Sequence, residues 1–158
     1  MRTLPNVPRR DEFDAVVVRT DHSDAESWQA VAAALMEPWG DEQYEPHVHV
    51  IDDPAWAEVS VDELRRALAV DEDLCVVFLA DQVTMRSEHH PLLAVTLLTR
   101  EECVDDEDYE RLTEFGTEFR TVPAGVHGIH ANLSIGNLGF EEFAAWAHDE
   151  PEGTFRDC

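Results

Sequence analysis

The fold is decided near the C-terminus, where residues 118–155 read EFRTVPAGVHGIHANLSIGNLGFEEFAAWAHDEPEGTF. This stretch alternates apolar and specific polar residues more densely than the rest of the chain. It predicts a short strand around Phe119, a helix opened by Pro123, a break at Gly136–Gly139 and a second helix, because proline favours the first turn of a helix and glycine ends one. We expect the earlier elements to pack against this unit.

The preceding residues predict strands and helices in alternation. Four apolar runs have the composition of strands, namely residues 15–18, 47–51, 74–80 and 92–98. Ser23–Glu26 and Ser60–Glu63 both match the capping box, in which the Ser and Glu side chains satisfy free amides at a helix start. These patterns place a helix after each of the first two strands. Residues 82–91 have about the length of a broad hairpin connection, so the third and fourth strands are expected to be antiparallel neighbours.

This order of elements predicts an α/β or α+β fold with a single domain. The expected sheet is mixed and has about five strands, with helices after strands 1 and 2 and a C-terminal helix pair. Its first three strands are expected to be parallel, because helical crossovers join them. Residues 154–156 could add a short edge strand.

The predicted domain occupies residues 14–158. Residues 1–13 are expected to form a loose N-terminal arm, because prolines and arginines there disfavour regular structure. That segment lacks the apolar core of a secretory signal, and the three cysteines show no CxxC spacing. We therefore expect a cytoplasmic protein with reduced cysteines, in which Cys75 belongs to the core.

Net charge is the strongest compositional signal. The chain has 35 acidic and 11 basic residues, a net charge of −24, and every basic residue is arginine. Such a charge repels nucleic acid and anionic membranes and attracts a basic protein, although a solvated or salt-adapted surface has the same composition. The absence of lysine excludes Schiff-base chemistry, a Walker-type phosphate lysine and a Ser–Lys dyad.

An acidic excursion at residues 101–114 concentrates this charge. Seven of the ten residues 101–110 are Asp or Glu, and the segment is expected to be a short helix or a loop that adds little to the core. Runs of this kind are usually solvated, and a functional one would dock a basic protein or imitate nucleic-acid phosphates. The residues predicted to bind a partner are Glu101, Glu102, Asp105, Asp106, Glu107 and Asp108.

Three apolar runs end in aspartate, at Asp21, at Asp52 and Asp53, and at Asp81. If the strands are parallel, these carboxylates meet at the edge of the sheet where open α/β sheets bind ligands. Converging carboxylates favour a divalent ion such as Mg²⁺, so Asp21, Asp52 and Asp81 are the predicted metal ligands. Aspartate is also common at such positions because its side chain satisfies free backbone amides.

His127, His130 and Ser134 are expected to share one helical stripe. Two histidines at this spacing can hold a transition metal if a third ligand approaches, but solvent-facing or capping histidines are commoner. Two other histidine pairs give a weaker signal, at residues 47 and 49 and at residues 89 and 90.

The NLSIG run at Asn132–Gly136 resembles half of a nucleophile elbow. It lacks the first glycine and the preceding strand, so we reject a serine hydrolase. Asn137 is instead expected to cap the final helix, and Asn132 to tie the break between the helices to the sheet.

The chain resembles a family of small actinobacterial proteins built on a domain of unknown function. The resemblance rests on VVRTDHSDAESW near the start, VVFLAD in the middle and FRTVP…IHANLSIGNLGFEEFA…GTFR at the end, and covers most of residues 14–156. Members of that family have Met-Asp at the position of Leu138-Gly139 and are shorter around residues 101–114. The resemblance implies a bacterial, cytoplasmic setting and no particular activity.

Two functional hypotheses follow. The first is a non-enzymatic acidic module, inhibitor-like or immunity-like, that binds a basic protein and contacts neither nucleic acid nor membrane. The alternative is a divalent-metal-dependent enzyme or sensor that uses the aspartates at the sheet edge, with Arg19 or Arg120 holding an anion. The sequence assigns neither a cofactor nor an oligomeric state.

Overall fold

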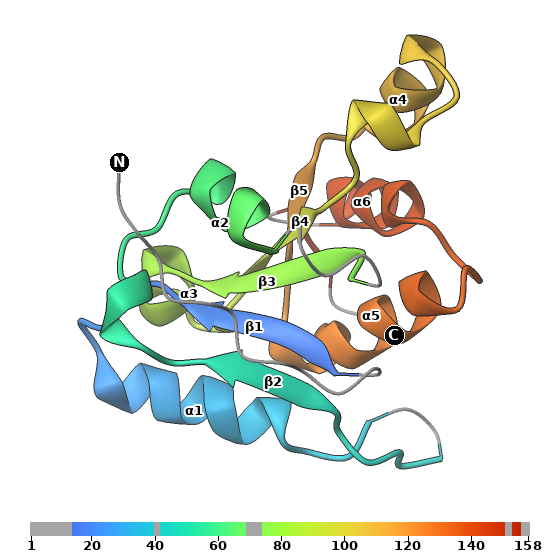
Figure 1. Ribbon diagram of the computed structural model, residues 1–158. Coiled ribbons are helices and arrows are strands. Elements are labelled where there is room, and N and C mark those ends of the chain that lie inside the picture. The colour runs from blue at the N-terminus through green and yellow to red at the C-terminus, as the bar shows by residue number, and fades with distance from the viewer. Residues whose placement is uncertain (1–13, 40–41, 69–73, 151–152, 156–158) are drawn as a thin grey trace.

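The computed structural model describes residues 14–39, 42–68, 74–150 and 153–155. Its strands form one mixed sheet in the order β2-β1-β3-β4-β5-β6 (Figure 1). The strands are β1 (Ala15–Arg19), β2 (Val48–Ile51), β3 (Val76–Ala80), β4 (Leu92–Thr96), β5 (Glu118–Thr121) and β6 (Thr154–Phe155). The α-helices are α1 (Ala25–Leu35), α2 (Val61–Leu68), α3 (Gln82–Arg86), α4 (Asp106–Leu112), α5 (Val126–Ser134) and α6 (Phe140–Asp149). The short 3₁₀ helices are η1 (Pro54–Trp56), η2 (Arg100–Glu102) and η3 (Pro123–Gly125). The predictions for residues 1–13, Arg156 and Cys158 lie outside the described residues.

The strand directions match the prediction. β1 pairs in parallel with β2 and with β3, whereas β4 runs antiparallel to both β3 and β5. The final strand β6 pairs in parallel with β5 and is the sixth strand, where about five were expected. The carboxyl ends of β1, β2, β3, β5 and β6 therefore lie at one edge of the sheet, called here the carboxyl edge. The opposite edge is called the amino edge.

Helices cover both faces of the sheet. The crossover through α1 leads from β1 to β2, and the crossover through α2 leads back past β1 to β3. Because both connections are expected to be right-handed but run in opposite directions, they place α1 and α2 on opposite faces. Figure 1 shows this layered arrangement, with α1 on one side of the sheet and α2 on the other.

Alternation in β1 divides the core into two clusters. Ala15 and Val17 pack in the cluster that holds Trp28, Val31 and Leu35 of α1. Val16 and Val18 point the other way and pack with residues of η1 and α2, namely Trp56, Leu64 and Leu68. All five residues of β1 are buried, which confirms a strand apolar on both faces.

The C-terminal unit closes the core on the α1 face. The Phe119 ring of β5 lies 5.0 Å from the Phe140 ring of α6, and Phe143 meets Phe155 of β6 edge-on at 5.4 Å. Both helices lie on the α1 side of the sheet, where Ile129 and Ala144 are fully or almost fully buried. The predicted strand, helix, break and second helix are confirmed.

Two of the three predicted caps are wrong. Asp24, not Ser23, caps α1, because its carboxylate accepts the Ser27 amide at 3.0 Å. The N-cap of α6 is Gly139 rather than Asn137, and the Glu142 carboxylate accepts the Gly139 amide at 2.8 Å. The capping box at Ser60–Glu63 is confirmed by its two reciprocal bonds, each 3.1 Å long.

Asn132 and Cys75 also differ from expectation. Asn132 does not reach the sheet: its amide donates to the Gly128 carbonyl, and its carbonyl accepts from Asn137 at 2.8 Å. Cys75 is exposed, because it lies just before the first residue of β3 rather than inside the strand. β3 and β4 are antiparallel neighbours as predicted, but their connection contains helix α3.

Gly125 gives a test of the packing between β5 and the helix pair. A Cβ at this position would collide with the Thr121 hydroxyl and touch the Phe155 ring. We expect Gly125→Ala to lower the free energy of unfolding by about 1–3 kcal/mol, the usual cost of overpacking. Thr121→Ala removes the colliding oxygen, so the double variant should lose less than the sum of the two single variants. A thermal-denaturation cycle with additive losses would show that this contact is relaxed.

Candidate functional site

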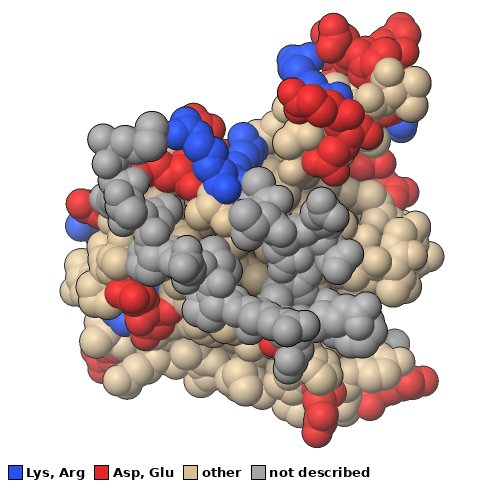
Figure 2. Space-filling model, in the orientation of Figure 1, with Lys and Arg blue, Asp and Glu red and all other residues tan. Residues whose placement is uncertain are grey.

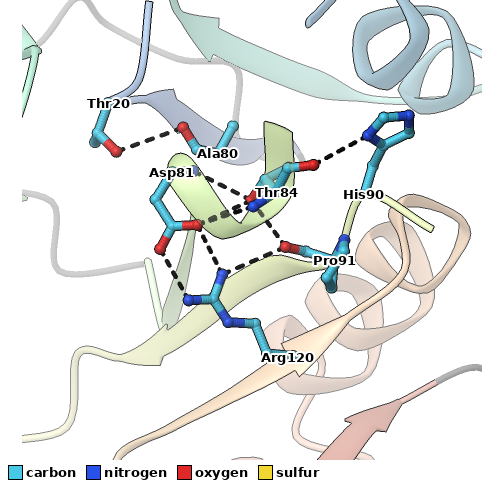
Figure 3. Close-up of polar contacts among 7 residues, drawn as sticks. All are labelled: Thr20, Ala80, Asp81, Thr84, His90, Pro91 and Arg120. Carbon is cyan, nitrogen blue, oxygen red and sulfur yellow. Dashed lines mark hydrogen bonds and ion pairs between the residues drawn. The ribbon is translucent and has the colours of Figure 1, made fainter. Parts of the chain in front are cut away.

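The carboxyl edge gathers the predicted aspartates. β2, β1 and β3 are adjacent and parallel, so Asp21, Asp52 and Asp81 follow neighbouring strand ends as expected. The Thr20 hydroxyl donates to the Ala80 carbonyl at 3.4 Å and joins the ends of β1 and β3 (Figure 3). This part of the prediction, the shared edge, is confirmed.

Asp81 is held by Arg120 of β5. Nη1 and Nη2 of Arg120 donate to the two carboxylate oxygens of Asp81 at 2.8 and 2.9 Å, and Nη1 also donates to the Pro91 carbonyl at 3.3 Å (Figure 3). The two side chains are 25% and 23% exposed, so the pair is partly shielded from water. This fork-to-fork geometry gives the strongest kind of hydrogen-bonded ion pair. It links β5 to the end of β3 across β4.

Thr84 and His90 complete the cluster around Asp81. The Thr84 amide donates to the Asp81 carboxylate at 3.2 Å, and the Thr84 hydroxyl accepts the Asp81 amide at 3.1 Å. The same hydroxyl donates to the Pro91 carbonyl at 2.8 Å, and Nδ1 of His90 donates to the Thr84 carbonyl at 3.0 Å (Figure 3). Asp81 is thus the N-cap of α3 as well as an ion-pair partner.

These contacts shift the pKa of Asp81. Burial by itself raises the pKa of a carboxyl group, but the Arg120 guanidinium and the Thr84 amide outweigh burial and hold the pKa of Asp81 below 3.8. Asp81 is therefore ionised at neutral pH and already neutralised by a cation from its own chain.

The other two aspartates have separate partners. Asp52 accepts from Nη1 of Arg19 at 3.2 Å, and the Arg19 guanidinium lies 5.1 Å from the Trp28 ring centre. The Asp21 carboxylate accepts the Ser23 amide at 2.7 Å. In the described part of the chain, no three His, Cys, Asp or Glu side chains come together in a way that could hold a metal ion. Metal binding by Asp21, Asp52 and Asp81 stays a prediction, without a described ligand cluster behind it.

The histidines of α5 are buried rather than solvent-facing. His127 and His130 are each 4% exposed, and Nε2 of His127 donates to the Leu35 carbonyl at 2.8 Å. The Trp39 ring stacks on His127 with ring centres 5.9 Å apart, and a cavity of about 160 Å³ lies beside both histidines. The expectation of solvent-facing histidines is wrong, because α5 packs this side against the end of α1. The bond from His127 to the carbonyl of Leu35, the last residue of α1, agrees with the capping alternative.

Ser134 ends α5 in an exposed position. Its hydroxyl lies 3.4 Å from Nε2 of His130, one helical turn earlier. No strand leads directly into this serine, since η3 and α5 precede it. The arrangement therefore lacks the strand-to-helix turn that a nucleophile elbow requires.

Burial lowers the pKa of His127, and the charge of His47 lowers it further, although the bond to the Leu35 carbonyl opposes both effects. A neutral imidazole is thus the form that fits the core.

The acidic excursion forms a projecting arm, residues 100–115, called here the acidic arm. It contains η2 and α4, and neither helix has a buried residue. Figure 1 shows α4 standing away from the sheet, and Figure 2 shows acidic side chains gathered on this projection. The expectation of a segment that adds little to the core is confirmed.

Some carboxylates of the acidic arm stabilise the arm itself. Glu102 accepts the Thr99 amide at 3.2 Å, and Asp105 caps α4 through the Asp108 amide at 2.8 Å. The Arg111 guanidinium at 2.8 Å and the Val104 amide hold the pKa of Asp108 below 3.8.

The pair of Asp81 and Arg120 was not predicted from the sequence. The two residues are 39 positions apart, and no local pattern connects them. The sequence suggests Arg120 only as an anion-holding group, whereas the structure places its guanidinium on the Asp81 carboxylate. The one available signal was Asp81 followed three residues later by Thr84, which matches a helix cap.

The ion pair predicts a specific loss of stability. We expect Asp81→Asn to lower the free energy of unfolding by about 2–4 kcal/mol at neutral pH, because it leaves a partly buried guanidinium without its charge partner. The Asp52 side chain lies at the same edge, but it is 40% exposed and accepts a single bond from an arginine. We therefore expect Asp52→Asn to lower the free energy of unfolding by at most about 1 kcal/mol. Because the folded pKa of Asp81 is lowered, its contribution persists above pH 3.8 and disappears as the pH falls through the folded value. Urea denaturation checks this, and equal losses for both variants would contradict it.

The lowered pKa of His127 predicts a second loss of stability as the pH falls. Its folded pKa lies below 6.5, so above that pH its protonation does not affect stability. Below pH 6.5 the unfolded chain binds a proton that the folded protein resists, and stability falls. In His127→Gln, whose amide can still donate to the Leu35 carbonyl, this part of the loss should vanish. Denaturation curves at about pH 7 and pH 5 measure the difference, and an unchanged pH slope would exclude His127 as its source.

The described part of the chain contains no helix that is both long and apolar enough to cross a bilayer.

A search among curated proteins gave no match. A family model, Domain of unknown function (DUF6924), matches residues 14–158, which confirms the expected membership of a domain-of-unknown-function family. Because this match covers almost the whole chain, the protein belongs to the DUF6924 family.

Proposed function

We propose that this protein is a non-enzymatic binding module that uses the acidic arm to dock a basic surface of another protein. An inhibitor-like or immunity-like protein that masks a basic site acts in this way. The observation that carries the proposal is the arm itself, a strongly acidic projection without a buried residue in its helices.

The arm is organised without contributing to the core. Its capping carboxylates Glu102, Asp105 and Asp108 hold η2 and α4 in shape, as described above. Because these bonds lie within the arm or join it to the adjacent Thr99, the arm can present a defined surface rather than a mobile charged loop. A preorganised surface loses less conformational entropy on binding than a disordered one.

Other carboxylates of the arm are exposed and available to a partner. Glu101, Glu107 and Glu110 are exposed, and the Asp106 bond to Arg100 is 3.4 Å long and equally exposed. Exposed ion pairs contribute little to stability, so these side chains can exchange partners at small cost. Complementary charge of this kind accelerates association and selects partners of the opposite sign.

The arm also exposes apolar groups. Val104 is 92% exposed and Phe115 is 40% exposed, one near each end of the arm. An exposed aliphatic or aromatic side chain beside charged groups is typical of an anchor in a protein interface. The combination supports a protein partner rather than a small cation.

Neutralising the exposed carboxylates tests the proposal. The variant Glu101→Gln, Asp106→Asn, Glu107→Gln and Glu110→Gln leaves the three capping residues intact. Its control carries Glu26→Gln, Glu37→Gln, Asp62→Asn and Glu88→Gln, all on exposed positions of the body. Both variants remove four negative charges, so a difference between them reports position and not net charge.

We expect labelled nona-arginine to bind the arm variant at least about tenfold more weakly than the wild type at about 0.05 M NaCl. The control should bind within about twofold of the wild type, and about 0.5 M NaCl should abolish the difference. Fluorescence anisotropy measures all of these affinities. Equal losses in both variants would mean that the charge of the whole surface, and not the arm, attracts the peptide.

A further inference from the structure

A cavity of about 900 Å³ opens at the amino edge of the sheet. It lies between the start of β3, the end of β4, the acidic arm and the turn that joins α5 to α6. Its volume falls in the range of about 300–1,000 Å³ that is usual for ligand sites. The aspartate cluster occupies the opposite edge, so the cavity is a separate feature.

The walls of this cavity are more apolar than polar. Their apolar side chains come from six different elements or turns and include Leu74, Leu97, Leu112, Leu133, Leu138 and Phe140. The exposed Cys75 also lines it. An apolar surface of this kind gains free energy when apolar side chains fill it and displace water.

The rim is acidic. Three carboxylates line the cavity, Glu102 from the arm and Glu141 and Glu142 from the first turn of α6, while no arginine or histidine is among the described lining residues. Glu142 is fixed by its bond to the Gly139 amide, and Glu102 by its bonds to Thr99. A ligand that suits this site is therefore apolar in its centre and cationic at its ends.

We propose that this cavity binds the apolar face of a basic amphipathic segment of the partner protein. The inference rests on the proposed function and adds the chemistry of the partner. Glu102 and Leu112 belong both to the arm and to the cavity lining, so a chain bound in the cavity also meets the arm. A small organic cation could fill the cavity but would leave the arm unused, which favours a peptide. Helices bind grooves in this manner through apolar residues at positions i, i+3, i+4 and i+7.

The probe is a labelled peptide of about 14 residues in which leucines repeat at helical spacing and the other positions are lysine or alanine. Its control is a scrambled peptide of the same composition without an apolar face. We expect the amphipathic peptide to bind at least about tenfold more tightly than the scrambled one, and to keep part of its affinity at about 0.5 M NaCl. Anisotropy measures both peptides on the full-length chain.

Cys75 reports directly on the cavity. In the variant Cys103→Ser and Cys158→Ser, Cys75 is the remaining thiol. A saturating amphipathic peptide should slow the reaction of Cys75 with N-ethylmaleimide by at least about tenfold, whereas the scrambled peptide should slow it by less than about twofold.

Cys75→Trp fills the cavity from an exposed position and should weaken binding of the amphipathic peptide by a similar factor. Val83→Trp, an exposed substitution on α3, is the matched control and should leave binding unchanged.

The outcomes separate the two proposals. If both peptides bind equally, lose affinity in the arm variant and leave Cys75 reactive, the arm docks basic chains but the cavity proposal is wrong. If Cys75 is protected only by the amphipathic peptide, the cavity proposal is supported. If neither basic peptide binds, both proposals are overturned.

Discussion

The structure depends on burying β1 on both faces. This strand lies between β2 and β3, and all of its residues are buried. A strand in that position needs a layer of helices on each side, and right-handed crossovers in opposite directions provide α1 on one face and α2 on the other. The same constraint brings the ends of β1, β2 and β3 to one edge. The C-terminal helix pair then completes the larger of the two core clusters.

The two edges of the sheet consequently have different chemistry. At the carboxyl edge, Asp81 and Asp52 each meet an arginine from their own chain, so charge that could attract a cation is compensated internally. At the amino edge, the acidic arm and the carboxylates at the start of α6 surround an apolar cavity. In a chain with a net charge of −24, the carboxyl edge stabilises the fold. The amino edge, where carboxylates outnumber the arginines that pair with them, is the surface to which we assign binding.

Particular residues show how far the sequence could be interpreted. The Ser60–Glu63 capping box was recognised because both partners lie within one helical turn, and the same local reasoning found the strand ends at Asp52 and Asp81. The cap at Asp24 was misplaced by one residue, because Ser23 and Asp24 are both good caps and only backbone geometry chooses between them. The burial of His127 was missed, since its partner, the Leu35 carbonyl, is 92 residues away.

The sequence by itself determined the order of the strands, the helices after β1 and β2 and the C-terminal helix pair, but not α3. It also determined the two-sided burial of β1, the shared edge of the aspartates and the acidity of the arm. Those features depend on periodicity, caps and composition, which act over a few residues. Only the tertiary structure decided that Arg120 neutralises Asp81, that α5 buries its histidines, and that residues around positions 74, 112 and 138 enclose a cavity. Such contacts join segments far apart in the chain, so no local pattern encodes them.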